Sequence, residues 1–273
     1  MRLRRVSIAL QSVVLWLLTL TVVVPFYMVV VNSLKNLPEA SAVNLQLPSV
    51  FEFANYREAF VQSKLLGSFF NSLYTTTMVV AITMTLSAMA AFVLARVNSR
   101  RNSFIFNVFL IGLIAPMNMV TTFQVLKKFD LINTYTGVIL LYCATFLPFS
   151  IFLYLNFIKG IPRELDDAGM VDGVQGFGLF FKIIFPLLTP VTVTVLIINF
   201  MNCWNDFTIP LYFLTTSDKW GMIIHLYGYM GTFFSQKNLM FAVMVMTMLP
   251  IVLIYLLGQK YIISGMVSGS LKG

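Results

Sequence analysis

The hydrophobic residues of this chain fall into six long runs, and most charged residues lie between them. Each run holds 22 to 31 residues without Asp, Glu, Lys or Arg, and a helix needs about 20 apolar residues to cross a bilayer. The runs are continuous rather than alternating, which favours helices over barrel strands. They lie at 6–31, 65–95, 102–126, 131–158, 183–205 and 238–259.

The pattern predicts an all-α membrane protein, with residues 1–273 forming a single transmembrane domain of six helices. The spans are expected at about 7–31, 69–95, 103–123, 135–158, 183–205 and 238–258. The first run follows a basic start but is longer than the apolar core of a signal peptide, so we expect a retained span. A shorter uncharged segment, 221–236, is expected to be extramembrane or re-entrant.

Composition narrows the class of protein further. Hydrophobic residues make up 59% of the chain and charged residues 10%, whereas a soluble domain carries roughly 25% charged residues. A soluble enzyme and a disordered chain are therefore excluded. Two cysteines in apolar runs, Cys143 and Cys203, and the single His225 favour neither a disulfide framework nor a metal site.

The net charge of +8 is expected to orient the chain rather than to bind nucleic acid. With the N-terminus inside, 11 of the 18 Lys and Arg residues fall on the inner side and 7 on the outer side. The short loop from Arg96 to Arg101 gives the clearest signal. Both termini are therefore predicted to be cytoplasmic, in a multi-pass protein.

The outer segment 32–64 is longer than a simple turn. Phe53, Tyr56 and Phe60 have the spacing of one face of a short amphipathic helix. Such a helix could seal the mouth of the bundle, or it could form a docking surface for an external partner. The spacing alone leaves both alternatives open.

The inner loop 159–182 is longer than a helical hairpin needs. Pro162 is expected to open a helix, and Glu164, Asp166 and Asp167 would lie in its first turns, where the helix dipole favours anions. Gly173 is placed to end that helix in a left-handed conformation. The expected outer face of the helix consists of Leu165, Ala168, Gly169 and Asp172. A second amphipathic run then leads into span five at Pro186, with one face made of Phe177, Phe180, Phe181 and Ile184.

The run Asp167-Ala-Gly-Met-Val-Asp-Gly173, followed after nine residues by Ile183-Ile-Phe-Pro186, resembles the EAA signature of ABC importer permeases. That signature is Glu-Ala-Ala, three residues, Gly, nine residues and Ile-x-Leu-Pro. Asp167, Gly169 and Phe185 depart from it, and Gly169 should loosen the helix by about 1 kcal/mol relative to Ala. Further segments resemble the carbohydrate-uptake branch, the relatives of the maltose permease second subunit. They are Asn71-Ser72, Ala90–Arg96, Leu131–Tyr135, Trp204–Phe207 and Gln259–Gly273.

The resemblance implies a bacterial cell-membrane permease subunit that works in a complex. It implies a second permease subunit, with a heterodimer favoured, two ATP-binding cassette subunits and an extracytoplasmic solute-binding protein. The chain has no G-x-x-x-x-G-K-[ST] run, so ATP and Mg²⁺ would be used by the partner ATPase and the chain itself is expected to bind no cofactor or metal. The residues that the resemblance assigns to ATPase coupling are Glu164, Asp167, Ala168, Gly169, Asp172, Gly173 and Pro186. The alternatives are a solvated dipole charge at Asp167 and a plain helix cap at Gly173.

Polar residues within spans are costly and often functional. On that ground the candidates for contact with a sugar are Asn118, Asn199, Asn202, Trp204, Asn205 and Asp206. Their other explanation is hydrogen bonding between helices. An ABC permease for a non-sugar or sugar-phosphate solute and an ion-coupled secondary transporter remain the competing functions, whereas a membrane enzyme lacks a convergent catalytic set.

Overall fold

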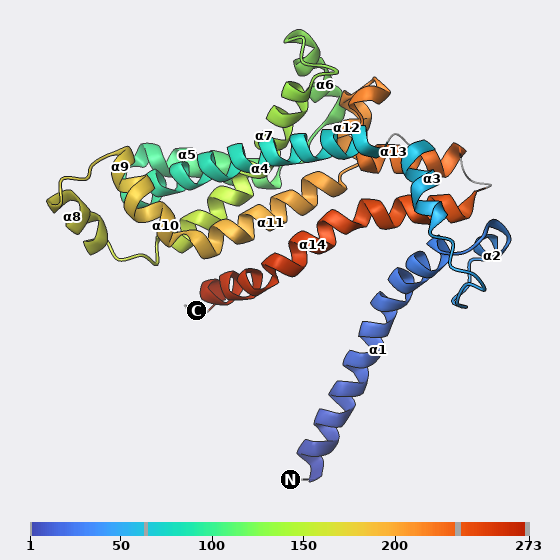
Figure 1. The fold of residues 1–273 in the computed structure, drawn as a ribbon. Helices are drawn as coiled ribbons and strands as arrows, with labels where there is room; N and C mark the ends of the chain where they lie inside the picture. Colours follow the sequence, from blue (N-terminus) through green and yellow to red (C-terminus); the bar gives the residue numbers. More distant parts are fainter. Residues whose placement is uncertain (1, 63–64, 233–235, 271–273) are drawn as a thin grey trace. The chain divides into compact units, whose positions relative to one another are not determined.

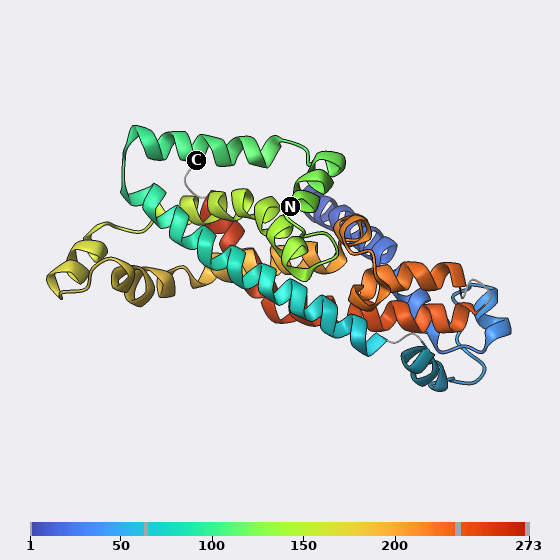
Figure 2. The same ribbon diagram turned by 90° about the horizontal axis from the view of Figure 1, so that it is seen from above.

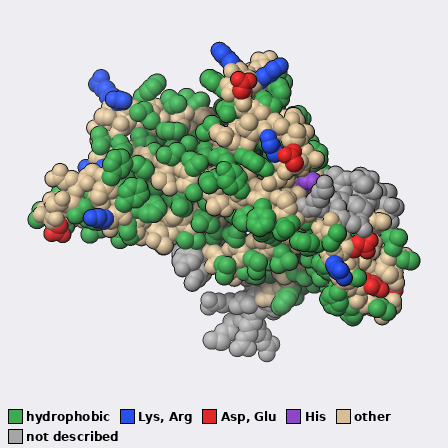
Figure 3. All heavy atoms as spheres, turned by 45° about the horizontal axis from the view of Figure 1, so that its top comes forward, with side chains coloured by type: hydrophobic (Ala, Val, Ile, Leu, Met, Phe, Trp, Pro, Cys, Tyr) green, Lys and Arg blue, Asp and Glu red, His purple; other side chains and the backbone are tan. Residues whose placement is uncertain are grey.

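The computed structural model describes residues 2–62, 65–232 and 236–270 (Figure 1). Over these residues every regular element is a helix, as predicted. Four helices are long and apolar enough to cross a membrane, or up to six if each of two bent pairs is one span. The four are Gln11–Ser33, Leu65–Arg96, Tyr135–Ile158 and Lys237–Gln259, which lie on four of the expected spans. On the face drawn in Figure 3, hydrophobic side chains dominate and charged ones are few.

The chain divides into two compact units, Met1–Gly67 with Ile224–Pro250, and Ser68–Ile223 with Ile251–Gly273. The first unit contains α1 (Arg2–Ser33), α2 (Leu37–Ser41), α3 (Ala54–Gln62), most of α13 (Met222–Thr232) and the first part of α14 (Lys237–Ser270). From Gln11 to Tyr27 every side chain of α1 is exposed. Because most of these side chains are apolar and none is charged, that part of α1 is suited to lipid or to another protein. The segment expected at 221–236 holds α13, and its residues 233–235 lie outside the described ones.

The polar end of α1 is bound by side chains that follow it. Lys35 is 1% exposed, and its ammonium group donates to Asn32 Oδ1 at 3.1 Å, to the Asn44 carbonyl at 3.1 Å and to Asn44 Oδ1 at 2.7 Å. All three donors of the ammonium group are thereby satisfied. Burial lowers the pKa of Lys35 from its ordinary value.

The helix expected around Phe53, Tyr56 and Phe60 is present as α3, but its phenylalanines do not seal the bundle within this chain. Phe53 is 68% exposed and Phe60 45% exposed, whereas Asn55 and Ala59 are buried. The Asn55 amide donates to the Ser33 carbonyl at 2.9 Å and to the Lys35 carbonyl at 2.8 Å, and accepts from Asn238 at 2.8 Å. Since carbonyls at the end of a helix lack partners within it, a polar side chain is buried here in place of the phenylalanines.

The second unit is built around α7 (Tyr135–Ile158), which contacts α5 (Arg100–Ile114), α11 (Thr189–Asn205) and α12 (Thr208–Phe213). Seen from above, α7 lies between α5 and α4 (Leu65–Arg96) (Figure 2). One core cluster joins the second half of α4 with α7, the segment 180–188 and α11. Its buried members are Ala88, Ala91, Ile151, Tyr154, Leu155, Ile158, Phe180, Ile184, Leu188, Val191 and Val195. These helices therefore share one interior.

Two of the expected spans are bent rather than straight. The run expected at 103–123 forms α5 and α6 (Met119–Lys128), with an angle of 119° between them. Pro116, which has no backbone N–H, lies in the break, and the Asn118 side chain accepts from the amides of Val120 and Thr121. The span expected here is therefore a bent pair of helices, which counts as one span only if both helices belong to it.

The run expected at 183–205 begins earlier and also bends. It comprises α9 (Phe177–Leu179), the π-helical turn η1 (Phe180–Ile184), α10 (Phe185–Leu187) and α11, with an angle of 81° at Leu188. Pro186 lies in the short α10 before the bend. The expected face of the second amphipathic run is divided, because Phe180 and Ile184 are buried while Phe177 and Phe181 are exposed.

The short helix α8 (Glu164–Val171) lies at one end of this unit, beyond the ends of α4 and α7 (Figures 1 and 2). It begins two residues after Pro162, so the expected start at that proline is wrong; the first helical bond runs from the Asp167 amide to the Arg163 carbonyl. The expected end is confirmed. Gly173 has a φ of +78°, its amide donates to the Met170 carbonyl and the Val174 amide donates to the Gly169 carbonyl, as in a Schellman cap.

The Asn55 bonds predict a stability effect. We expect Asn55→Ala to lower the free energy of unfolding by about 1–3 kcal/mol, because two buried carbonyls and one amide lose their partner. Thermal unfolding of the purified chain in detergent measures the loss. Arg57→Ala is the matched control, since Arg57 lies on the same helix with an exposed side chain. An equal loss in both variants would contradict the role of the Asn55 bonds.

The left-handed backbone at Gly173 predicts a local effect. A Cβ atom there would meet no heavy atom within 4 Å, so any loss comes from the backbone alone. Gly173→Ala should destabilise the end of α8 by about 1 kcal/mol, and Gly173→Asn by less, because Asn adopts this conformation more readily. Hydrogen exchange of the α8 amides measures the difference; equal exchange in wild type and Gly173→Ala would contradict it.

Candidate functional site

The helix α8 presents most of the predicted coupling residues on its exposed side. Glu164, Asp167, Ala168 and Asp172 are exposed, and the three acids of the first turn are in place as predicted. Exposed apolar side chains lie among them: Leu165 is 41% exposed, Met170 46% and Val171 87%. The exposed side of α8 therefore combines negative charge with apolar surface, which suits a partner groove with both properties.

Gly169 lies on the opposite side, which corrects its expected place on the outer face. It is buried, and a Cβ atom at this position would collide with Ile183 Cδ1 and would lie 2.8 Å from Leu179 Cδ1. The close approach that a glycine permits is therefore made to the chain's own second helix. Residues 183 and 179 follow α8 in the sequence, so Gly169 lets the loop fold back on itself.

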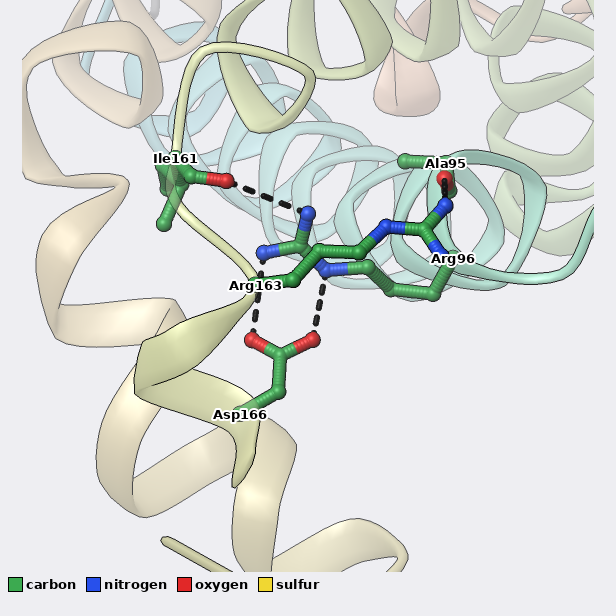
Figure 4. A network of polar contacts seen from close by, with 5 residues as sticks. All are labelled: Ala95, Arg96, Ile161, Arg163 and Asp166. Carbon is green, nitrogen blue, oxygen red and sulfur yellow. Dashed lines mark hydrogen bonds and ion pairs between the residues drawn. The ribbon is translucent and has the colours of Figure 1, made fainter. Parts of the chain in front are cut away.

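The other buried residue of α8 is Asp166, which pairs with Arg96 in the last turn of α4 (Figure 4). Arg96 Nε lies 2.6 Å from Asp166 Oδ2, and Arg96 Nη2 donates to Asp166 Oδ1 at 3.1 Å. The pair therefore combines one hydrogen bond, from Nη2, with a close ion-pair contact at Nε that lacks hydrogen-bond geometry. The remaining terminal nitrogen, Arg96 Nη1, donates to the Ile161 carbonyl at 3.2 Å.

A second arginine completes the contact between the loop and α4. Arg163 Nη2 donates to the carbonyl of Ala95 at 3.4 Å (Figure 4). That carbonyl belongs to the last turn of α4, where helix carbonyls lack internal partners and favour a cation. The loop thus donates a hydrogen bond to α4 through Arg163, and α4 donates hydrogen bonds to the loop through Arg96.

The sequence placed Asp166 in the first turn of α8 and Arg96 at the end of a span, but it did not pair them. Seventy residues separate them, and no periodicity relates positions on different helices. The sequence offered a group of acids in the first turn of a short helix and a basic residue at the end of a span, but nothing that selects Asp166 as the partner of Arg96. Among the described residues, no group of three His, Cys, Asp or Glu side chains is placed to hold a metal ion.

Four of the six candidates for cargo contact have partners within the chain. Asn118 caps α6, and Asp206 accepts from the Thr208 and Ile209 amides at 3.0 Å and from the Tyr142 hydroxyl at 2.8 Å. The buried Asn199 donates to Ser150 Oγ at 3.0 Å. Trp204 is 2% exposed. Its ring stacks on Phe200 and meets Phe69 edge-on.

The remaining two, Asn202 and Asn205, are exposed on α11. In the described part of the chain neither side chain forms a hydrogen bond. The sequence spacing of Asn199, Asn202 and Asp206 suits one face of a helix, but the structure forms no such face. Asn199 is buried, Asn202 is exposed and Asp206 follows the end of the helix. Only Asn202 and Asn205 thus offer free amides on the surface of α11.

Residues 83–268 match the family described as "Binding-protein-dependent transport system inner membrane component". The melibiose/raffinose/stachyose import permease protein MelC of Bacillus subtilis is 32% identical over 253 residues, covering 92% of this chain and 91% of that protein. The diacetylchitobiose uptake system permease protein NgcG of Streptomyces coelicolor is 31% identical, covering 98% of this chain and 90% of that protein.

A solved structure shows the same fold. It is a bacterial ABC transporter involved in the import of the acidic polysaccharide alginate, 18% identical, with a TM-score of 0.85 over 96% of this chain and 98% of that one. At 18% identity, this structural similarity establishes the fold alone. Together with the apolar helices, the family match shows that this chain is a multi-pass membrane protein and a transport component, belonging to the family of binding-protein-dependent transport system inner membrane components.

Proposed function

We propose that the chain is a permease subunit of an ATP-driven importer that carries a sugar or oligosaccharide across the bacterial plasma membrane. The observation that supports this most is the set of relatives that align over nearly the whole chain. Those described above are named for oligosaccharides, and the multiple sugar-binding transport system permease protein MsmG of Streptococcus mutans is 32% identical over 92% of the chain. A carbohydrate cargo is the simplest property they share.

In this proposal α8 is the coupling helix. Its exposed acids and apolar residues enter a groove on an ATP-binding cassette subunit, and Ala168 allows a close approach. ATP and Mg²⁺ are held by the ATPase. Closure of the ATPase pair moves α8, and the membrane helices switch between inward-facing and outward-facing packings as a rigid-body change. Cargo-loaded binding protein and ATP favour the same packing, so their binding is coupled.

The proposed orientation places α8 and both termini in the cytoplasm. The excess of Lys and Arg on that side supports it. A second permease subunit completes the pathway, with a heterodimer favoured. The exposed apolar length of α1 and the absence of buried residues in α5 support extensive contact with lipid or with another subunit.

A second cargo class deserves a test. The sulfoquinovosyl glycerol transport system permease protein SmoH of Agrobacterium fabrum is 29% identical over 83% of this chain. That name describes a sugar derivative with an acidic group, so an anionic sugar conjugate is the alternative cargo. Uptake assays with neutral oligosaccharides and with such conjugates distinguish the two.

The coupling role of α8 predicts the effect of bulk at Ala168. In proteoliposomes with the complete complex, Ala168→Trp should reduce binding-protein-stimulated ATPase and uptake by about tenfold, because the indole blocks the approach of the ATPase. Asn98→Trp is the control, since Asn98 is exposed outside α8. Uptake in wild type that follows an ion gradient and needs no ATP would contradict the proposal and favour a secondary transporter.

The free amides on α11 predict a change in cargo affinity. Asn202→Ala and Asn205→Ala should each raise the KM for uptake by roughly three- to tenfold, the effect of one lost hydrogen bond. Asn199→Ala should instead lower thermal stability and leave KM unchanged, because its partner is Ser150. Unchanged KM in both exposed variants would assign Asn202 and Asn205 to contact with another subunit.

A further inference from the structure

The ion pair between Arg96 and Asp166 connects α8 to a helix that is remote from it in the chain. The backbone joins α8 directly to α7 on one side and, through α9, η1 and α10, to α11 on the other. Neither connection reaches α4. The contact between α8 and α4 therefore depends on side chains, and Arg96 and Asp166 form its strongest part.

The contacts of the Arg96 guanidinium group fix how α8 is held against α4. The guanidinium group donates hydrogen bonds from Nη2 to the carboxylate and from Nη1 to the Ile161 carbonyl, and its Nε makes an ion-pair contact with the carboxylate. Three contacts on one planar group fix its orientation, which a single ammonium contact could not do. The side chains of Arg96 and Asp166 are 11% and 9% exposed, so water competes little with the pair.

A second hydrogen bond connects the loop to α4, and α4 itself is packed into the core of this unit. Arg163 binds the Ala95 carbonyl, beside Arg96 in the last turn of α4. Farther along α4, Ala88 and Ala91 belong to the core cluster that includes α7, the segment 180–188 and α11. A displacement of α8 that pulls on Arg96 therefore acts on a helix already packed with the other two.

We propose that Arg96 and Asp166 are positioning residues that make α4 follow the coupling helix, so that α4, α7 and α11 move together when the ATPase subunits close. This inference rests on the coupling function proposed above. The ion pair between Arg96 and Asp166 stays formed while α8 moves, so the displacement of α8 is transmitted to α4. Without the ion pair α8 reaches α4 only through the Arg163 bond and through the packing of α4 against α7 and α11, so α4 follows the movement of α8 less completely.

The test uses the complete complex in proteoliposomes, loaded with its binding protein and cargo. The variants are Arg96→Gln, Asp166→Asn and their double variant, with Asp166→Glu as the conservative change. Arg101→Gln is the matched control, because Arg101 is exposed just beyond α4. Subunit assembly, basal ATPase, stimulated ATPase and cargo transported per ATP are measured for each.

We expect each single variant to assemble and keep its basal ATPase, and to transport about tenfold less cargo per ATP. The double variant should be no worse than either single variant, since both remove the same interaction. Asp166→Glu should restore most of the transport, and Arg101→Gln should match wild type.

Two results would overturn the inference. One is a normal amount of cargo per ATP in Arg96→Gln and Asp166→Asn. The other is a loss of uptake that only follows a loss of assembled complex, which would make the pair a static anchor. Failure of the proposed function is distinguishable, because wild type itself would then show no ATP-dependent uptake.

Discussion

A backbone amide or carbonyl without a hydrogen bond is too costly inside a bilayer, and the form of this chain follows from that constraint. The apolar runs are helical because helices satisfy their own backbone groups. At two helix breaks, a polar side chain accepts the hydrogen bonds that the next helix cannot satisfy internally. Asn118 accepts from the first amides of α6, and Asp206 accepts from those of α12. Several polar residues of the apolar runs are thus explained by backbone demand. Of the six candidates for cargo contact, Asn202 and Asn205 are the two that keep exposed amides without a hydrogen bond among the described residues.

The same demand organises the end of the second unit where α8 lies. Arg163 donates to the Ala95 carbonyl and Arg96 donates to the Ile161 carbonyl, so two arginines satisfy backbone groups at the end of α4 and in the loop that follows α7. Asp166 then neutralises Arg96 where both are largely shielded from water. A buried charge needs such a partner, because it is costly alone. The result is a short helix with one side bound to the chain and the other exposed.

That division explains why small residues in α8 have different roles. Ala168 and Gly169 are neighbours in the sequence, yet Ala168 is exposed while Gly169 meets Ile183 and Leu179. Gly173 contributes through its backbone, since open space surrounds it. A motif match treats these positions alike. Their separate contributions become visible only once the loop has folded back on its second helix.

The sequence by itself determined the class of protein, the positions of most long apolar helices, the acidic start of α8 and the glycine at its end, because these depend on local composition and backbone preference. It could not determine which face of a helix is buried. The outward Phe53 and Phe60, the inward Gly169 and the pairing of Arg96 with Asp166 depend on neighbours outside their own helices. The bends at Pro116 and Leu188 likewise appear only in the structure, because the length of a hydrophobic run does not show whether the helix that it forms is straight or bent. Tertiary contacts decided these features, because a side chain is buried only when a second element of the structure packs against it.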